Sequence, residues 1–176
     1  MTRSDLEHLI RAAGKIAGER ELVVIGSQAV LGQFPEATGI LSRSMEADLY
    51  PLSRPELADS IDGAIGEGST FHQTHGYYAQ GVGPDTATLP RNWQKRLVRI
   101  ENSNTGGIAG LCLEVHDLAI SKYVAGREKD REFTRALARC EMTNKATLLD
   151  RLAATKLDPA VAKLVTGRIE SDFTKN

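Results

Sequence analysis

The chain has 176 residues, a length that suits a single domain, and 41% of its residues are hydrophobic, which is enough for one buried core. Its 22 Lys and Arg residues nearly balance its 23 Asp and Glu residues, and the net charge of -1 excludes a histone-like protein and a polybasic membrane binder. No apolar run reaches the roughly 18 residues of a membrane-spanning helix, and the first residues lack the apolar block of a signal peptide. We therefore expect a cytoplasmic protein that does not bind a membrane.

The cysteines and histidines offer little chemistry. Cys112 and Cys140 are too few for a disulfide framework and lack the paired spacing of a zinc ligand set, so we expect two reduced, buried thiols. Cys112 lies in an apolar segment and is a poor candidate nucleophile. His72 and His75 have no third ligand nearby, which argues against a zinc site.

The first part of the chain mixes helical and strand patterns. Ser4 and Glu7 have the spacing of a capping box ahead of an amphipathic helix. Residues 22–25 form a short, wholly apolar run that predicts a central strand. The next predicted elements are a short helix at 28–32, a loop at 34–44, a strand at 45–50, and a helix capped by Ser53 that spans 57–65.

Strand patterns then give way to helical ones. The candidate strands lie at 77–82, 97–101 and 108–115. The candidate helices lie at 116–125, 128–140, 145–155 behind Thr143 or Asn144, and 159–173 behind Asp158. This order predicts an α+β fold, with a mixed sheet of about five strands and flanking helices. We expect an α/β core at 1–115 and a helical C-terminal part at 116–176, packed together as one compact unit.

Two carboxylates alternate along the predicted strand at 45–50. Residues two apart on a strand share a face, so Glu46 and Asp48 present their side chains together. Such oxygen ligands suit Mg²⁺, which completes its coordination with water and substrate phosphates. Upstream, Gly26 lets backbone N–H groups approach a phosphate, and Ser27 adds a hydroxyl donor. Together the two features predict metal-assisted chemistry on a phosphate group.

Lys122 emerges from a face of small and apolar residues in the predicted helix at 116–125. Burial of a lysine without an anion is costly, whereas a triphosphate would satisfy it. If that helix continues through Gly126, Asp130 follows Lys122 along the same stripe. If Gly126 ends the helix, this alignment fails.

Each of these features also has a plainer interpretation. A Gly-Ser pair is often an ordinary turn between a strand and a helix. The acidic pair also fits the solvated face of an edge strand, with Arg43 and Arg54 close enough in sequence to pair with it. The alternating charges at 127–132 are typical of a solvated helix face.

In combination, the Gly26-Ser27 turn and the Glu46-x-Asp48 pair resemble the signature of the nucleotidyltransferase fold. Residues 117–130, DLAISKYVAGREKD, resemble a block of small bacterial nucleotidyltransferase-like proteins, which are similar to the AbiEii and MenT toxins of toxin–antitoxin pairs. The segment at 83–90 is also similar to that group. The resemblance implies that Mg²⁺ is held by Glu46 and Asp48. It implies that the nucleotide is bound by Gly26, Ser27, Lys122 and Arg127. It implies catalytic roles for Lys122 and Asp130.

The resemblance also implies an activity, namely transfer of a nucleoside monophosphate from a nucleoside triphosphate to a hydroxyl acceptor. The acceptor would be a tRNA 3′ end or a protein, and the biological role that of a toxin opposed by an antitoxin protein. The alternative is a catalytically inert nucleotidyltransferase-like module that binds a partner or a nucleotide. It is motivated by Glu46, where the superfamily usually has Asp, and by the lack of a clear third metal carboxylate, for which Asp85 and Glu114 are the candidates.

Overall fold

The computed structural model describes residues 1–174. Its centre is a five-stranded mixed sheet with the order β3-β2-β1-β5-β4. The strands are β1 (Glu21–Val24), β2 (Glu46–Pro51), β3 (Tyr78–Gly81), β4 (Val98–Ile100) and β5 (Ala109–Cys112). The helices are α1 (Arg3–Ala17), α2 (Val30–Gln33), α3 (Ala58–Ile65), α4 (Thr70–His75), α5 (Val115–Ala125), α6 (Glu128–Arg139), α7 (Lys145–Ala153) and α8 (Pro159–Asp172). The α+β fold with a mixed sheet is thus confirmed.

The predicted central strand is the middle strand of the sheet. β1 pairs in parallel with β5 and antiparallel with β2, while β3 runs parallel to β2 and β4 antiparallel to β5. Leu22, Val23 and Val24 are all fully buried, because both faces of β1 are covered. This two-sided burial explains why the sequence of the strand is apolar without interruption.

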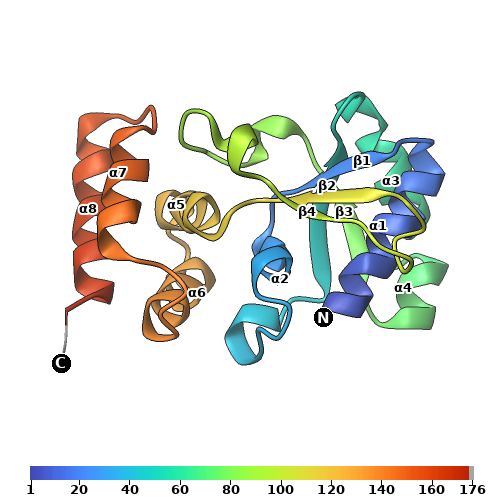
Figure 1. The fold of residues 1–176 in the computed structure, drawn as a ribbon, viewed down its shortest axis with the longest axis horizontal. Coiled ribbons are helices and arrows are strands. Elements are labelled where there is room, and N and C mark those ends of the chain that lie inside the picture. The colour runs from blue at the N-terminus through green and yellow to red at the C-terminus, as the bar shows by residue number, and fades with distance from the viewer. Residues whose placement is uncertain (175–176) are drawn as a thin grey trace.

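The helices form two groups on either side of the sheet (Figure 1). α1 and α3 pack against each other and against the strands, and short α4 follows α3. At the other side of the molecule, α5 and α6 lie between the sheet and the outer pair α7 and α8 (Figure 1). α5 contacts α2 and the 3-10 helix Ser27–Ala29, and α6 contacts the 3-10 helix Gly39–Ser42. These contacts place the helical part directly against the Gly-Ser turn.

The predicted cap of the first helix is wrong. α1 begins two residues earlier than Ser4 implies, because Thr2 has an extended backbone and forms a capping box with Asp5. Glu7 is free for another role and accepts hydrogen bonds from Arg3, Asn102 and Asn104. The Ser53 cap is also wrong, since a 3-10 turn at Pro55–Leu57 precedes α3. By contrast, Asn144 and Asp158 cap α7 and α8 as predicted.

Helix α4 has no counterpart among the predicted elements. It is capped by the Ser69 hydroxyl, which accepts from the backbone N–H of His72 at 3.1 Å. His75 lies in a ring cluster with His8, Phe71 and Tyr77. The histidines of this region therefore serve packing, and residues 1–174 contain no group of three or more His, Cys, Asp or Glu side chains arranged to hold a metal.

The two cysteines differ in environment. Cys112 is fully buried on β5, and this burial raises the pKa of its thiol to about 12, as expected for an inert thiol. Cys140 is exposed, so its predicted burial is wrong. Cys140 is the residue that follows the last turn of α6, which ends at Arg139, and it is not part of the buried face of that helix. Within the described part of the chain, no helix has the length and apolar character needed to cross a bilayer.

Candidate active site

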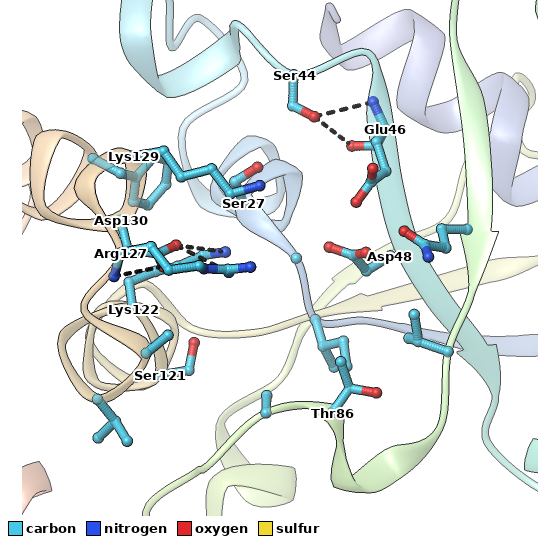
Figure 2. A pocket seen from close by; sticks show the side chains of 18 of the residues that line it. Ser27, Ser44, Glu46, Asp48, Thr86, Ser121, Lys122, Arg127, Lys129 and Asp130 are labelled. Atoms are coloured by element: carbon cyan, nitrogen blue, oxygen red, sulfur yellow. Dashed lines mark hydrogen bonds and ion pairs between the residues drawn. The ribbon is translucent and has the colours of Figure 1, made fainter. Parts of the chain in front are cut away.

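A cleft of about 620 Å³ lies between the sheet and helices α5 and α6. This volume is typical of small-molecule sites, which measure roughly 300–1,000 Å³. The cleft is lined by all the residues predicted to act at the site, namely Gly26, Ser27, Glu46, Asp48, Lys122, Arg127 and Asp130. Figure 2 shows the two carboxylates of β2 on one side and the lysines and Arg127 of the helical part on the other.

The acidic wall is one face of β2. Glu46 and Asp48 line the cleft, whereas Ala47 and Leu49, which alternate with them, are fully buried on the opposite face. β2 lies between β1 and β3, so it is not an edge strand. The arginines considered as partners pair elsewhere, Arg43 with Glu132 at 3.8 Å and Arg54 with Glu19. The interpretation of the acidic pair as a solvated edge face is therefore wrong.

The two carboxylates carry uncompensated negative charge. Burial, followed by hydrogen bonding to and repulsion by Glu46, raises the pKa of Asp48 to about 6, against the opposing effect of Lys122 and Lys129. Among the ion pairs within residues 1–174, none includes Glu46 or Asp48. Paired hard oxygen donors without a bound counter-charge have the chemistry that suits a divalent cation such as Mg²⁺.

A glycine is required at position 26 because the side chain of Asp48 lies against its backbone. Its backbone is extended, so conformational freedom is not the reason for a glycine here. A Cβ at this position would collide with Oδ2 of Asp48. The backbone N–H of Ile25 also donates to the carbonyl of Asp48 at 3.0 Å. The Gly-Ser turn and the acidic strand therefore form one continuous surface, with Ser27 at the start of a 3-10 helix.

The cationic wall is organised by Asp130, which is only 2% exposed. Its Oδ1 lies 3.6 Å from Nζ of Lys122, and its Oδ2 accepts from Nε of Arg127 at 2.7 Å. Of the two alternatives for Gly126, the structure shows that the helix ends: Gly126 caps α5 in the left-handed region with φ of 64°, so Lys122 and Asp130 do not share one helical stripe. α6 then folds back along α5, and this reversal brings Asp130 to Lys122.

Neither candidate for a third carboxylate lines the cleft. Glu114 caps α5 by accepting from the backbone N–H of His116 at 3.1 Å, and it also contacts the His116 ring at 2.6 Å. Asp85 lies in a 3-10 turn, Pro84–Thr86, outside the lining. The residue beside Asp48 on β3 is Gln80, which lines the cleft with an amide.

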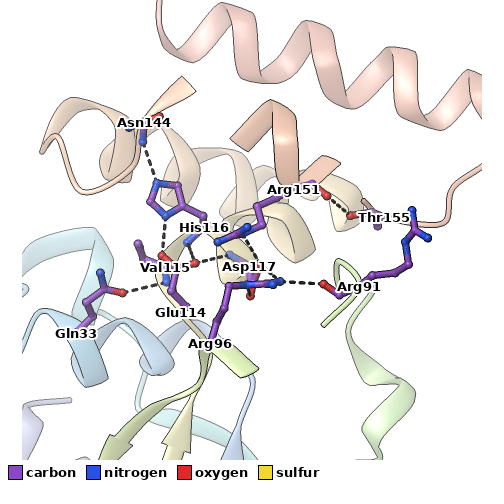
Figure 3. A network of polar contacts seen from close by, with 10 residues as sticks. All are labelled: Gln33, Arg91, Arg96, Glu114, Val115, His116, Asp117, Asn144, Arg151 and Thr155. Atoms are coloured by element: carbon purple, nitrogen blue, oxygen red, sulfur yellow. Dashed lines mark hydrogen bonds and ion pairs between the residues drawn. The ribbon is translucent and has the colours of Figure 1, made fainter. Parts of the chain in front are cut away.

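A second charge cluster is centred on the buried Asp117 of α5 (Figure 3). Asp117 is 0% exposed and accepts from Arg96 at 2.7 and 2.9 Å, while Nε of Arg151 lies 3.2 Å away. Arg96 also donates to the carbonyl of Arg91 at 3.2 Å. This cluster joins α5, α7 and the loop that follows β3, and residues 86–88 of the same loop line the cleft.

Sequence reasoning missed Tyr78 and Gln80. Tyr78 on β3 donates a hydrogen bond to Oε2 of Glu46 at 2.9 Å, and Gln80 faces Asp48 in the same register. The signal that would have found them is the pairing of β2 with β3, since the cross-strand partner of a cleft residue shares its face of the sheet. Nothing in either strand alone specifies that pairing.

The mixed sheet, the Gly-Ser turn and the paired carboxylates define a nucleotidyltransferase-like α+β protein. A family model described as nucleotidyltransferase of unknown function (DUF6036) matches residues 4–158, which include both walls of the cleft. The chain belongs to this family. No curated protein and no solved structure matches the chain. The family match confirms the nucleotidyltransferase resemblance, and the likeness to AbiEii and MenT toxins stays a prediction.

Proposed function

We propose that the protein is a Mg²⁺-dependent nucleotidyltransferase that transfers a nucleoside monophosphate from a nucleoside triphosphate to a hydroxyl acceptor. The observation that carries this proposal is the cleft itself, where an uncompensated carboxylate pair faces Lys122 and Arg127. A triphosphate with a divalent cation would satisfy both walls at once, since the cation neutralises the acids and the phosphates neutralise the bases.

On the acidic wall, Glu46 and Asp48 would hold Mg²⁺ through carboxylate oxygens. The bound cation would supply neutralisation of the triphosphate charge and polarisation of the α-phosphate. Both side chains project from one strand of the sheet, so the backbone presets their spacing. The contact of Gly26 with Asp48 leaves this carboxylate little freedom to turn away from the cleft.

On the opposite wall, Lys122 and Arg127 would bind the phosphates. Asp130 positions these two basic side chains, one through each of its carboxylate oxygens. Backbone N–H groups at Gly26 and the Ser27 hydroxyl contribute further donors. The acceptor hydroxyl oxygen bonds to the α-phosphorus, the bond from that phosphorus to the bridging oxygen breaks, and the hydroxyl proton passes to water. Pyrophosphate leaves with negative charge that Lys122 and Arg127 stabilise.

Incubation of the protein with each labelled nucleoside triphosphate, Mg²⁺, and total RNA or cell protein tests this activity. We expect label in one acceptor class, and nuclease and protease treatment identify which. Asp48→Ala should abolish the transfer, whereas Asp85→Ala, outside the cleft, should retain it. Absence of transfer to every acceptor, or transfer unaffected by Asp48→Ala, would overturn the proposal.

The role as a toxin extends the proposal through the AbiEii and MenT resemblance. In that role the acceptor is a tRNA 3′ end or a protein, and an antitoxin protein opposes the enzyme. Induced expression should then arrest growth, and Asp48→Ala should relieve the arrest. Growth at the normal rate with active enzyme present would reject the toxin role without affecting the proposed transfer reaction.

A catalytically inert binding module is the second candidate. It is favoured by Glu46, where the superfamily usually has Asp, and by Gln80 beside Asp48, which supplies an amide in place of a third carboxylate. Calorimetry separates the two candidates, because an enzyme shows Mg²⁺-coupled affinity for a nucleoside triphosphate, whereas the absence of such coupling favours the inert module.

A further inference from the structure

Tyr78 is the cross-strand partner of Glu46. In the parallel pairing of β2 with β3, Glu46 stands opposite Tyr78, and the phenol hydroxyl donates to Oε2 of Glu46 at 2.9 Å. Tyr78 is 9% exposed, and the hydrogen bond is partly buried. The pairing of β2 with β3 therefore places the Tyr78 hydroxyl next to the Glu46 carboxylate.

The Tyr78 ring is itself held in place from outside the sheet. The ring of His72 on α4 packs on it with a centroid separation of 4.6 Å. His72 is fixed in turn, because its Nδ1 accepts from the backbone N–H of Gly68 at 3.0 Å and its own N–H donates to Ser69. Helix α4 thus orients the phenol toward Glu46.

Glu46 is also held at its backbone. The Ser44 hydroxyl donates to the carbonyl of Glu46 at 3.1 Å and accepts from its N–H at 3.0 Å (Figure 2). The remaining freedom lies in the side chain, which has one more torsion than an aspartate. A hydrogen bond to one carboxylate oxygen restricts that torsion and leaves the other oxygen available to a cation.

We propose that Tyr78 is a positioning residue that orients the Glu46 carboxylate for binding a divalent cation. This inference rests on the proposed function, because it assumes the cation site of Glu46 and Asp48. Partners that orient a metal-binding carboxylate typically contribute 10- to 100-fold to metal affinity. In this chain the longer Glu46 side chain makes such a partner more important than it would be for an aspartate.

The burial of Tyr78 and its contact with Glu46 raise the pKa of the phenol to about 12. The hydroxyl therefore stays protonated near neutral pH and remains a donor.

Calorimetric titration with Mn²⁺, in the absence of nucleotide, measures the effect directly. We expect Tyr78→Phe to weaken Mn²⁺ binding about 10-fold, the lower end of the range for such partners. Tyr77→Phe is the matched control, because it also removes a hydroxyl hydrogen bond, to His8 at 2.8 Å, but that bond does not involve Glu46. It should bind Mn²⁺ like the unaltered protein.

A double-mutant cycle distinguishes positioning from a general structural effect. In a Glu46→Asp background, the added Tyr78→Phe change should weaken Mn²⁺ binding by less than about 2-fold, because the shorter side chain needs less restriction. An equal loss in both backgrounds, or an equal loss in Tyr77→Phe, would overturn the positioning role. Circular dichroism confirms that each variant is folded.

A further readout needs no variant of Tyr78. With ¹³C-labelled tyrosine, Mg²⁺ should shift the Tyr78 ring signal and leave that of Tyr77 in place. Mn²⁺ binding that is unchanged in Tyr78→Phe, or an unshifted Tyr78 signal on Mg²⁺ binding, overturns this inference and leaves the proposed function standing. Failure of the unaltered protein to bind Mn²⁺ or Mg²⁺ overturns both.

Discussion

The protein contains two groups of buried charge that the fold treats in opposite ways. Asp117 is fully buried and is compensated by Arg96 and Arg151, with contacts of 2.7 to 3.2 Å. Asp48, in the cleft, has another carboxylate as its neighbour, and its pKa rises to about 6. The carboxylate that joins structural elements is paired with two arginines, whereas the acids of the cleft have no ion-pair partner among residues 1–174.

The largest expected effect comes from breaking the compensated cluster. Asp117→Ala leaves Arg96 and Arg151 without their buried anion, and loss of one partner in such a cluster costs about 3–5 kcal/mol. Urea unfolding measures this loss. Glu101→Ala, which breaks the exposed pair with Arg99, is the control and should cost less than about 1 kcal/mol. Equal losses would show that the Asp117 cluster is not special.

The next effect concerns the contact of Gly26 with Asp48. In Gly26→Ala the new Cβ collides with the Asp48 carboxylate, so Asp48 must move, at a cost of about 1–3 kcal/mol. We expect Mn²⁺ affinity to fall about 10-fold or more, since each tenfold change corresponds to about 1.4 kcal/mol. Gly83→Ala, at a position with open space, should bind Mn²⁺ normally. Normal binding by Gly26→Ala would contradict the proposed geometry.

A smaller effect follows from the charge of the acidic pair. The folded state raises the pKa of Asp48 from 3.8 to about 6, so ionisation of Asp48 destabilises the folded protein as the pH rises through 6. Asp48→Asn should therefore stabilise the ligand-free protein by about 1–2 kcal/mol at pH 8, after allowance for partial solvent screening. Below pH 3.8 the gain should vanish.

Thermal unfolding across this pH range measures the gain from Asp48→Asn. Gln80→Glu is a variant of opposite sign, because it adds a carboxylate beside Asp48 and should destabilise the protein at pH 8. A gain from Asp48→Asn that is the same at low and high pH would contradict this account, since it would not depend on ionisation.

The smallest effect is expected on the exposed side of the cationic wall. The Arg127 side chain is 60% exposed, and Lys122 still faces Asp130 when the guanidinium is removed. Arg127→Gln should therefore reduce the free energy of unfolding by less than about 1 kcal/mol. Urea unfolding measures this change, and a loss comparable to that of Asp117→Ala would place Arg127 among the compensated structural charges.

Local sequence patterns predict those parts of the fold that depend on near neighbours. The apolar run at 22–25 identifies the central strand because its burial is two-sided, and Asn144 and Asp158 are found because capping is a local interaction. Helix α4 is missed because its six residues carry too few apolar positions to show a helical period. Thr2 is missed because both Thr2 and Ser4 satisfy the capping preference.

The same distinction between local patterns and tertiary contacts applies to the residues of the candidate site. Gly26, Glu46 and Asp48 can be predicted to line the cleft because each belongs to a short local pattern, a Gly-Ser turn or two carboxylates alternating on one strand. Tyr78 depends on the pairing of β2 with β3, which neither strand specifies alone. Asp130 reaches Lys122 through the chain reversal at Gly126, a tertiary contact that the spacing along one helix does not specify.

That reversal also bears on how the protein is made. Arg168 on α8 packs against Gly126 and donates to the carbonyl of Tyr123 at 2.6 Å, so the last helix braces the turn between α5 and α6. During synthesis the N-terminal part emerges first, and the acidic strand leaves the ribosome well before its cationic counterpart. A growing chain therefore lacks this brace on the turn between α5 and α6, which carry the cationic wall of the cleft, until α8 has been translated.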